Sequence, residues 1–205
     1  YPCRESTLSA MSQLPSTVLA RILGQARQRP DSVALQRCDG TGALTYSDLV
    51  SGLNRVVADL STHSVTRGSR VLVVSDSGPE TYLSVLACAR LGAIAVMADS
   101  RLPVATVDRF REITEPAAIL IPPGNPFGSA LLPEGLCSLP AITVDGHSSP
   151  APTHRPDTVD GGDLGAEDPL AMVFTSGTTG EPKAVLLPNR TFYAIQDILC
   201  EQQLG

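Results

Sequence analysis

The clearest periodic segment of the chain follows Thr45. Its apolar residues recur with the spacing of one helical face, at Leu49, Leu53, Val56, Val57 and Leu60. Thr45 with Asp48 three residues later is typical of a capping box, here in a weaker Asp version. We therefore expect a helix from Thr45 with one buried face, and a similar pattern predicts an earlier helix over Pro15–Gln28.

Short apolar, β-branched runs alternate with further helical segments. The expected strands are Ser32–Arg37, Arg70–Ser75, Ala93–Ala98, Ala117–Ile121, Ala141–Val144, Leu170–Phe174 and Ala184–Leu187. The expected helices are Gly78–Arg90, with Gly92 as its stop, Pro103–Thr114, and a last one capped by Asn189 and carrying Phe192, Ile195, Ile198 and Leu199. Strands joined by helices predict an α/β fold with a parallel sheet covered by helices on both faces.

Composition fits one globular unit. The chain has 205 residues, of which 42% are hydrophobic and 18% charged, enough to bury a core. Residues 1–14 are expected to be an N-terminal extension, and 15–205 the folded unit. Eight prolines between residues 122 and 156 predict a surface loop there, interrupted by the strand at Ala141–Val144.

Charge and cysteine usage exclude several classes of function. The net charge of −6 argues against nucleic acid as a partner, because binding a phosphate backbone needs clustered Lys and Arg. The five cysteines form no C-x-x-C pair and the three histidines have no metal-ligand spacing, so we expect no metal site built from them. No apolar run approaches the ~18 residues of a membrane span, and a cytoplasmic protein is expected.

The segment that indicates chemistry is a polar loop between the last two expected strands. Its candidate ligand-binding residues are Thr175, Ser176, Gly177, Thr178, Thr179, Gly180 and Lys183. Hydroxyls, backbone N–H groups exposed by glycine and one lysine suit phosphate oxygens. The loop lacks the Gly-Lys-Ser/Thr of a Walker loop, and no G-x-G-x-x-G follows any strand. A solvated hairpin of the same composition is the alternative.

The loop and two other stretches resemble one family. LAMVFTSGTTGEPKAVLLPNRTF over Leu170–Phe192 is similar to the phosphate-loop motif of AMP-forming adenylating enzymes. LTYSDLVSGLNRVVADL over Leu44–Leu60 and GPETYLSVLACARLGAIAVMAD over Gly78–Asp99 resemble two further segments, in the same order. The superfamily includes acyl-CoA synthetases, fatty-acyl-AMP ligases and peptide-synthetase adenylation domains. Within this superfamily, the sequence of these stretches resembles that of actinobacterial fatty-acyl ligases of the FadD group.

The resemblance implies a reaction. A carboxylic acid, in this group a fatty acid, attacks the α-phosphate of ATP with Mg²⁺ present, and the acyl-adenylate then passes to a thiol of coenzyme A or of an acyl carrier protein. Thr175–Lys183 would hold the β- and γ-phosphates, with Lys183 as the cationic contact. Two positions depart from the family pattern: Ala184 stands where glycine is commonest, and Asn189 where many relatives have histidine.

Several family motifs do not occur in these residues. The Tyr-Gly-x-Thr-Glu and Thr-Gly-Asp segments that the family uses for adenine, Mg²⁺ and ribose are missing, and Lys183 is the only lysine. The expectation is therefore a partial AMP-binding (adenylation) domain without the C-terminal subdomain, inactive alone. The alternatives are a non-catalytic ATP- or partner-binding module and part of an amino-acid-activating adenylation domain; no kinase signature is present.

Overall fold

The computed structural model describes residues 18–37, 40, 42–76, 78–124, 133–145, 164–175 and 182–192. Its helices are α2 (Val18–Gln28), α3 (Tyr46–Thr62), α4 (Pro79–Leu91), α5 (Val104–Thr114) and α6 (Glu134–Cys137). Its strands are β1 (Val33–Leu35), β2 (Leu44–Thr45), β3 (Arg70–Ser75), β4 (Ile94–Asp99), β5 (Ala118–Ile121), β6 (Ala141–Thr143), β7 (Pro169–Thr175) and β8 (Lys183–Pro188).

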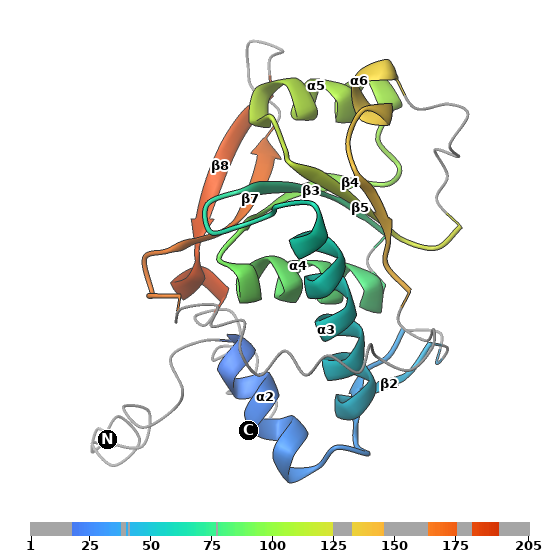
Figure 1. Ribbon diagram of the computed structural model, residues 1–205, viewed down its shortest axis with the longest axis vertical. Helices are drawn as coiled ribbons and strands as arrows, with labels where there is room; N and C mark the ends of the chain where they lie inside the picture. Colours follow the sequence, from blue (N-terminus) through green and yellow to red (C-terminus); the bar gives the residue numbers. More distant parts are fainter. Residues whose placement is uncertain are drawn as a thin grey trace, which may run out of the picture.

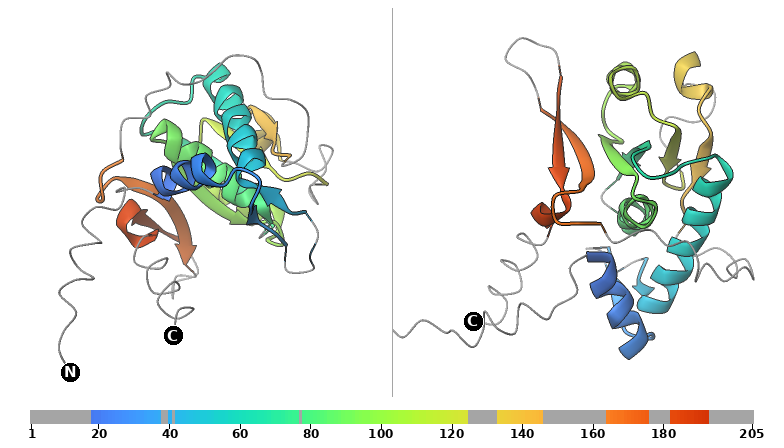
Figure 2. Two further views of the ribbon diagram at one scale, coloured as in Figure 1. Left: turned by 90° about the horizontal axis from the view of Figure 1, so that it is seen from below. Right: turned by 60° about the vertical axis from the view of Figure 1, so that its left-hand side comes forward.

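A six-stranded sheet in the order β6-β5-β3-β4-β7-β8 forms the centre of the molecule. All neighbouring strands are parallel except β8, which pairs antiparallel with β7. Helices α3 and α4 cover one face, with α2 beyond them, and α5 and α6 cover the other (Figures 1 and 2). The expected α/β fold with helices on both faces is confirmed.

The helix ends follow from local chemistry. The Thr45 hydroxyl accepts the Asp48 backbone N–H at 3.1 Å, and Asp48 Oδ2 accepts the Thr45 N–H at 3.0 Å, which completes the expected capping box. Gly92 ends α4 in the left-handed region with φ 65°. A side chain there would be strained by the backbone and would also meet Arg67 Cγ at 2.9 Å.

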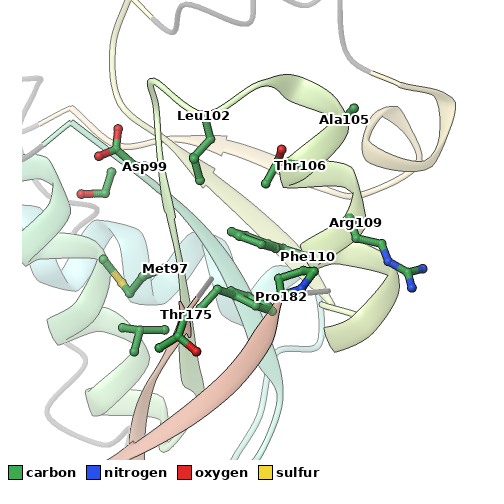
Figure 3. Close-up of a pocket in the computed structure, with 12 residues that line it drawn as sticks. Met97, Asp99, Leu102, Ala105, Thr106, Arg109, Phe110, Thr175 and Pro182 are labelled. Carbon is green, nitrogen blue, oxygen red and sulfur yellow. The ribbon is translucent and has the colours of Figure 1, made fainter. Parts of the chain in front are cut away.

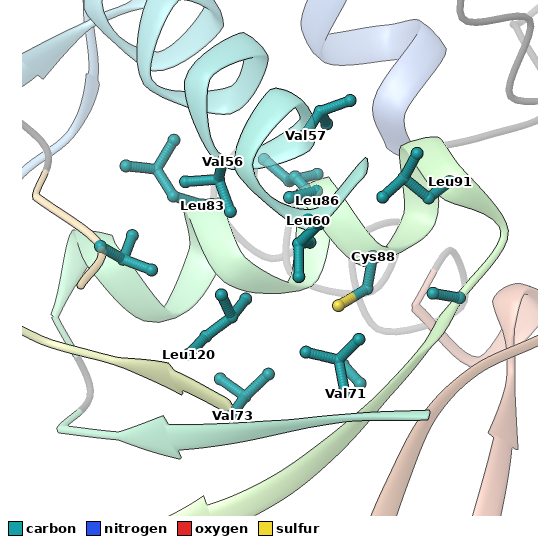
Figure 4. Packing of buried hydrophobic residues seen from close by; sticks show 14 of the residues in the cluster. Val56, Val57, Leu60, Val71, Val73, Leu83, Leu86, Cys88, Leu91 and Leu120 are labelled. Carbon is teal, nitrogen blue, oxygen red and sulfur yellow. The ribbon is translucent and has the colours of Figure 1, made fainter. Parts of the chain in front are cut away.

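The central strands are buried from both sides. Val71, Val73 and Leu120 face α3 and α4, while Leu72 and Ile119 face α5, and all five side chains are 0% exposed. Figure 4 shows the first three pointing from the sheet toward the helices. Burial on both faces explains why these strands are continuous apolar runs in the sequence, without the alternation of a half-exposed sheet.

The structure corrects several expectations. The strand at Ser32–Arg37 shortens to β1, which pairs with the unexpected two-residue strand β2 in a separate sheet. The proline-rich segment contains the unexpected helix α6, and Pro103 is the N-cap of α5 instead of its first residue. Other boundaries differ by one or two residues. The expectations for residues 1–17, 38–39, 125–132, 146–163 and 193–205 lie outside the described residues.

Strand β8 lies at the edge of the sheet and is largely exposed. Val185 and Leu186 are 40% and 50% exposed. No described helix or strand is paired with its outer edge. No described helix is both long and apolar enough to cross a membrane.

Candidate functional site

The strand order creates a crevice at the carboxyl ends of the parallel strands. The chain leaves β3 for α4 on one face, and it leaves β4 for α5 on the opposite face. Ligands of open α/β sheets bind at such a switch point, outside the carboxyl ends of the strands. The register pairs Ser75 at the end of β3 with Asp99 at the end of β4, so both residues lie at the carboxyl ends of these strands.

Strand β7 is parallel to β4, so the polar loop that follows Thr175 begins at the same carboxyl ends of the strands. It pairs with β4 through Ala95–Ala171 and Val96–Met172. Beyond Met172, β7 pairs only with β8, with Phe174 opposite Ala184 and Thr175 opposite Lys183. The two ends of the loop are therefore held together in a hairpin.

A cleft of about 730 Å³ opens where β7 separates from β4 (Figure 3). Its lining residues are Ser75, Met97, Asp99, Leu102, Ala105, Thr106, Arg109, Phe110, Val173, Phe174, Thr175 and Pro182. Apolar side chains form most of the surface, and the hydroxyls of Ser75, Thr106 and Thr175 supply hydrogen-bonding groups. The volume and this mixture are typical of a small-molecule site.

Two of the candidate phosphate-binding residues lie in the described part of the chain. Thr175 is at the cleft, and its hydroxyl oxygen lies 3.5 Å from the Lys183 carbonyl oxygen. The Lys183 side chain is exposed at the start of β8 and forms no ion pair with any described residue. Ser176, Gly177, Thr178, Thr179 and Gly180 lie outside the described residues. Their role therefore stays a prediction.

The main charged pair at the cleft is Asp99 with Arg101. Arg101 Nη2 and Nε donate to the two carboxylate oxygens at 2.6 and 2.9 Å, and the Arg101 backbone N–H donates at 2.8 Å. The side-chain hydrogen bond from Arg101 is the main cause that lowers the pKa of Asp99 from 3.8 to about 2. The carboxylate is thus ionised and held in one orientation at the carboxyl end of β4.

We expect Asp99 to remain ionised in acid. Because its pKa is lowered, the stabilisation from the pair is present above the ordinary value of 3.8 and is lost as the pH falls toward 2. A carbon-13 NMR titration of the Asp99 carboxyl should show a flat signal down to about pH 3, and Arg101→Ala should raise the midpoint toward the ordinary value, with the backbone N–H of residue 101 still donating. Arg109→Ala is the matched control, and a normal midpoint in the unaltered chain would contradict the assignment.

A second charged cluster fixes the turn after β3. Arg37 Nη2 lies 2.7 Å from Glu80 Oε2 and 3.5 Å from Asp76 Oδ2, while Asp76 Oδ1 accepts the Gly78 N–H at 2.8 Å. A Cβ on Gly78 would collide with the Arg37 guanidinium and the Glu80 carboxylate. The cluster ties the β1–β2 sheet to the N-terminus of α4, where an acidic side chain is stabilised by the helix dipole.

The buried side chain of Asn189 joins two segments of the backbone. It is 2% exposed, and its amide nitrogen donates to the carbonyl oxygens of Leu164 and Gly165 at 3.2 and 3.3 Å. It begins a helical turn that the structure describes as far as Phe192. These contacts hold the segment before β7 against the end of β8, which accounts for a residue that departs from the family pattern.

The described residues contain no cluster of three or more His, Cys, Asp or Glu that could hold a metal ion. Among the cysteines of the described part, Cys88 is buried, which raises the pKa of its thiol to about 12 and keeps it protonated. The buried Cys88 thiol is therefore not available as a thiolate nucleophile.

The α/β architecture, the switch-point cleft and the hairpin beside it are typical of small-molecule-binding domains of the open-sheet class. A family model described as AMP-binding enzyme matches residues 23–203. The chain belongs to this family.

Close relatives are fatty-acid ligases. The chain is 61% identical over 201 residues to the fatty acid–[acyl-carrier-protein] ligase MmaC of Mycobacterium marinum, covering 95% of this chain and 38% of that protein. It is 58% identical over 200 residues to the medium/long-chain-fatty-acid–[acyl-carrier-protein] ligase FadD10 of Mycobacterium tuberculosis, covering 96% and 37%. The chain thus spans well under half the length of these relatives.

Solved structures share the fold. The fatty acyl-adenylate ligase from L. pneumophila, in complex with acyl adenylate and pyrophosphate, aligns with a TM-score of 0.66 and 19% identity, over 92% of this chain and 32% of that one. The N-terminal subdomain of Klebsiella oxytoca NpsA aligns with a TM-score of 0.63 and 22% identity, over 85% and 42%. The described elements therefore have the architecture of an adenylating enzyme's N-terminal part.

Sequence reasoning found the hairpin loop and missed what surrounds it. The Asp99–Arg101 pair, Ser75 and the stacked rings of Phe110 and Phe174 come from the fold. One signal was available for Asp99, because an acidic residue directly after a buried parallel strand lies at the ligand-binding edge of the sheet. The ring contact has no comparable local signal.

Proposed function

We propose that this chain supplies the phosphate-binding part of a ligase that activates a fatty acid as an acyl-adenylate. The observation that supports this most is the position of Thr175–Lys183. A family phosphate-loop motif begins at the carboxyl end of β7, beside a cleft at the switch point of the sheet. A solvated hairpin with no ligand would not need that position.

The reaction forms one bond at the α-phosphorus of ATP and breaks another. A carboxylate oxygen attacks the α-phosphorus, the bond to the bridging oxygen of the β-phosphate breaks, and pyrophosphate leaves with the electron pair. In this proposal the hydroxyls and N–H groups of Thr175–Gly180 hold the departing phosphates, and Lys183 adds a positive charge. These groups bind and orient the phosphates; they take up no proton in this step.

ATP and Mg²⁺ are the proposed cosubstrate and cofactor. Mg²⁺ prefers oxygen ligands and is bound in many enzymes through one or two carboxylates together with substrate phosphates. In this proposal the ion accompanies the phosphates of ATP. It would reduce the charge repulsion between the phosphates and the attacking carboxylate.

The acceptor in this proposal is the thiol of an acyl carrier protein. The relatives at 61% and 58% identity are both named fatty acid–[acyl-carrier-protein] ligases, which favours a carrier protein over coenzyme A and a fatty acid over an amino acid. The thiolate would attack the carbonyl carbon of the acyl-adenylate and release AMP. The residues that bind the acceptor are not assigned to these segments.

A chimeric enzyme tests this function. The matched 201-residue segment of the Mycobacterium marinum ligase is replaced by the corresponding residues of this chain. We expect the chimera to exchange labelled pyrophosphate into ATP only when a fatty acid is present. The 205-residue chain alone should give no exchange, because the adenine- and ribose-binding motifs of the family do not occur in it. A folded chimera without exchange would contradict the proposal.

A further inference from the structure

Two phenylalanine rings join the polar hairpin to α5. The rings of Phe110 in α5 and Phe174 in β7 are stacked, with centroids 3.6 Å apart and planes 5° from parallel. Phe110 is 5% exposed and belongs to the cluster between α5 and the sheet, against which Phe174 packs. Both residues line the cleft. Figure 3 shows Phe110 together with Thr175 and Pro182, which come from the two ends of the loop.

This contact lies where the hairpin has little other support. The pairing of β7 with β4 ends at Met172, and β8 on the other side is an exposed edge strand. The last residues of β7 therefore extend from the sheet as a two-stranded arm, and such an isolated pair of strands is only marginally stable. Phe174 lies in this arm and packs on Phe110 of the α5 layer.

We propose that Phe110 is a positioning residue for the phosphates of ATP, because its stack on Phe174 fixes the adjacent Thr175 at the start of the phosphate loop. This inference rests on the proposed function. Phosphate-transfer sites depend on donors that are already in place before the substrate arrives. A hairpin that could swing relative to α5 would have to be ordered by ATP itself, at the expense of binding affinity.

The test compares Phe110→Leu, which keeps apolar volume but removes the flat ring, with Phe110→Tyr, which keeps the ring. Val107→Ala is the structural control, since Val107 lies in the same helix and cluster and is 0% exposed. The variants are made in the chimera. Hydrogen–deuterium exchange of the peptide containing Thr175 measures how firmly the hairpin is held, and steady-state kinetics measure KM for ATP and for the fatty acid separately.

We expect Phe110→Leu to speed exchange at Thr175 and to raise KM for ATP about three- to tenfold, with KM for the fatty acid unchanged. Phe110→Tyr should leave the exchange rate at Thr175 and KM for ATP as they are in the unaltered chimera. Val107→Ala should lower Tm without changing the exchange rate or KM for ATP. If Phe110→Leu changes only Tm, as the control does, the inference is wrong. Faster exchange at Thr175 in a chimera that makes no adenylate would support the contact and count against the proposed function instead.

Discussion

Lys183→Ala should lower fatty-acid-dependent pyrophosphate exchange by the chimera roughly 100- to 1,000-fold, the usual effect of removing one group that stabilises transition-state charge. Lys183 is the only lysine of the chain. It stands opposite Thr175 at the end of the loop. Its loss would leave the proposed phosphate site without the positive charge that the motif supplies.

The fold should survive this substitution. The Lys183 side chain is exposed, so its removal uncovers no buried group, and Tm should change by no more than surface substitutions usually cause. Arg190→Ala is a matched control, because Arg190 is an exposed cation beyond the other end of β8, and its ion pair with Glu167, at 3.0 Å, lies outside the cleft. Unchanged exchange in Lys183→Ala would mean that this lysine is not a phosphate contact.

Leu120→Ala should lower the free energy of unfolding by about 2–5 kcal/mol. Leu120 lies in β5, is 0% exposed and belongs to the cluster between the sheet and helices α3 and α4 (Figure 4). Alanine would leave a cavity that backbone strands on both sides prevent from closing, because β5 is paired with β3 and with β6. Urea unfolding of the 205-residue chain measures the loss.

The same substitution at an exposed position serves as the control. Leu186 in β8 is 50% exposed, so Leu186→Ala should change stability by about 0.5 kcal/mol or less. The contrast between two leucines tests the assignment of the core directly. Equal effects of the two substitutions would show that β5 is not the interior strand described above.

The elements that the sequence predicted well are those with local causes. The strand at Arg70–Ser75 has the expected bounds, and the capping box at Thr45 starts a helix as its two side chains require. Strand β2 and helix α6 are shorter than any periodic pattern can reveal. The existence of β2 depends on its pairing with β1, which no local feature of Leu44–Thr45 encodes.

The candidate site likewise has one feature with a local sequence signal and others that depend on contacts between distant residues. The hairpin loop could be found because its residue types are unusual and contiguous. The cleft could not, since it depends on β7 leaving β4 after Met172 and on Phe174 meeting a ring of α5 that is distant in the sequence. The antiparallel direction of β8 is likewise set by the short connection between β7 and β8, and the β-branched run alone does not show it.

The central proposal is that these residues support attack of a fatty-acid carboxylate on the α-phosphate of ATP. The most direct test gives the chimera a fatty acid labelled with oxygen-18 in its carboxylate, together with ATP and an acyl carrier protein, and analyses the nucleotide product by mass spectrometry. The account predicts AMP that carries one labelled oxygen, and Lys183→Ala should slow its formation. Unlabelled AMP, or release of ADP in place of AMP, would contradict it.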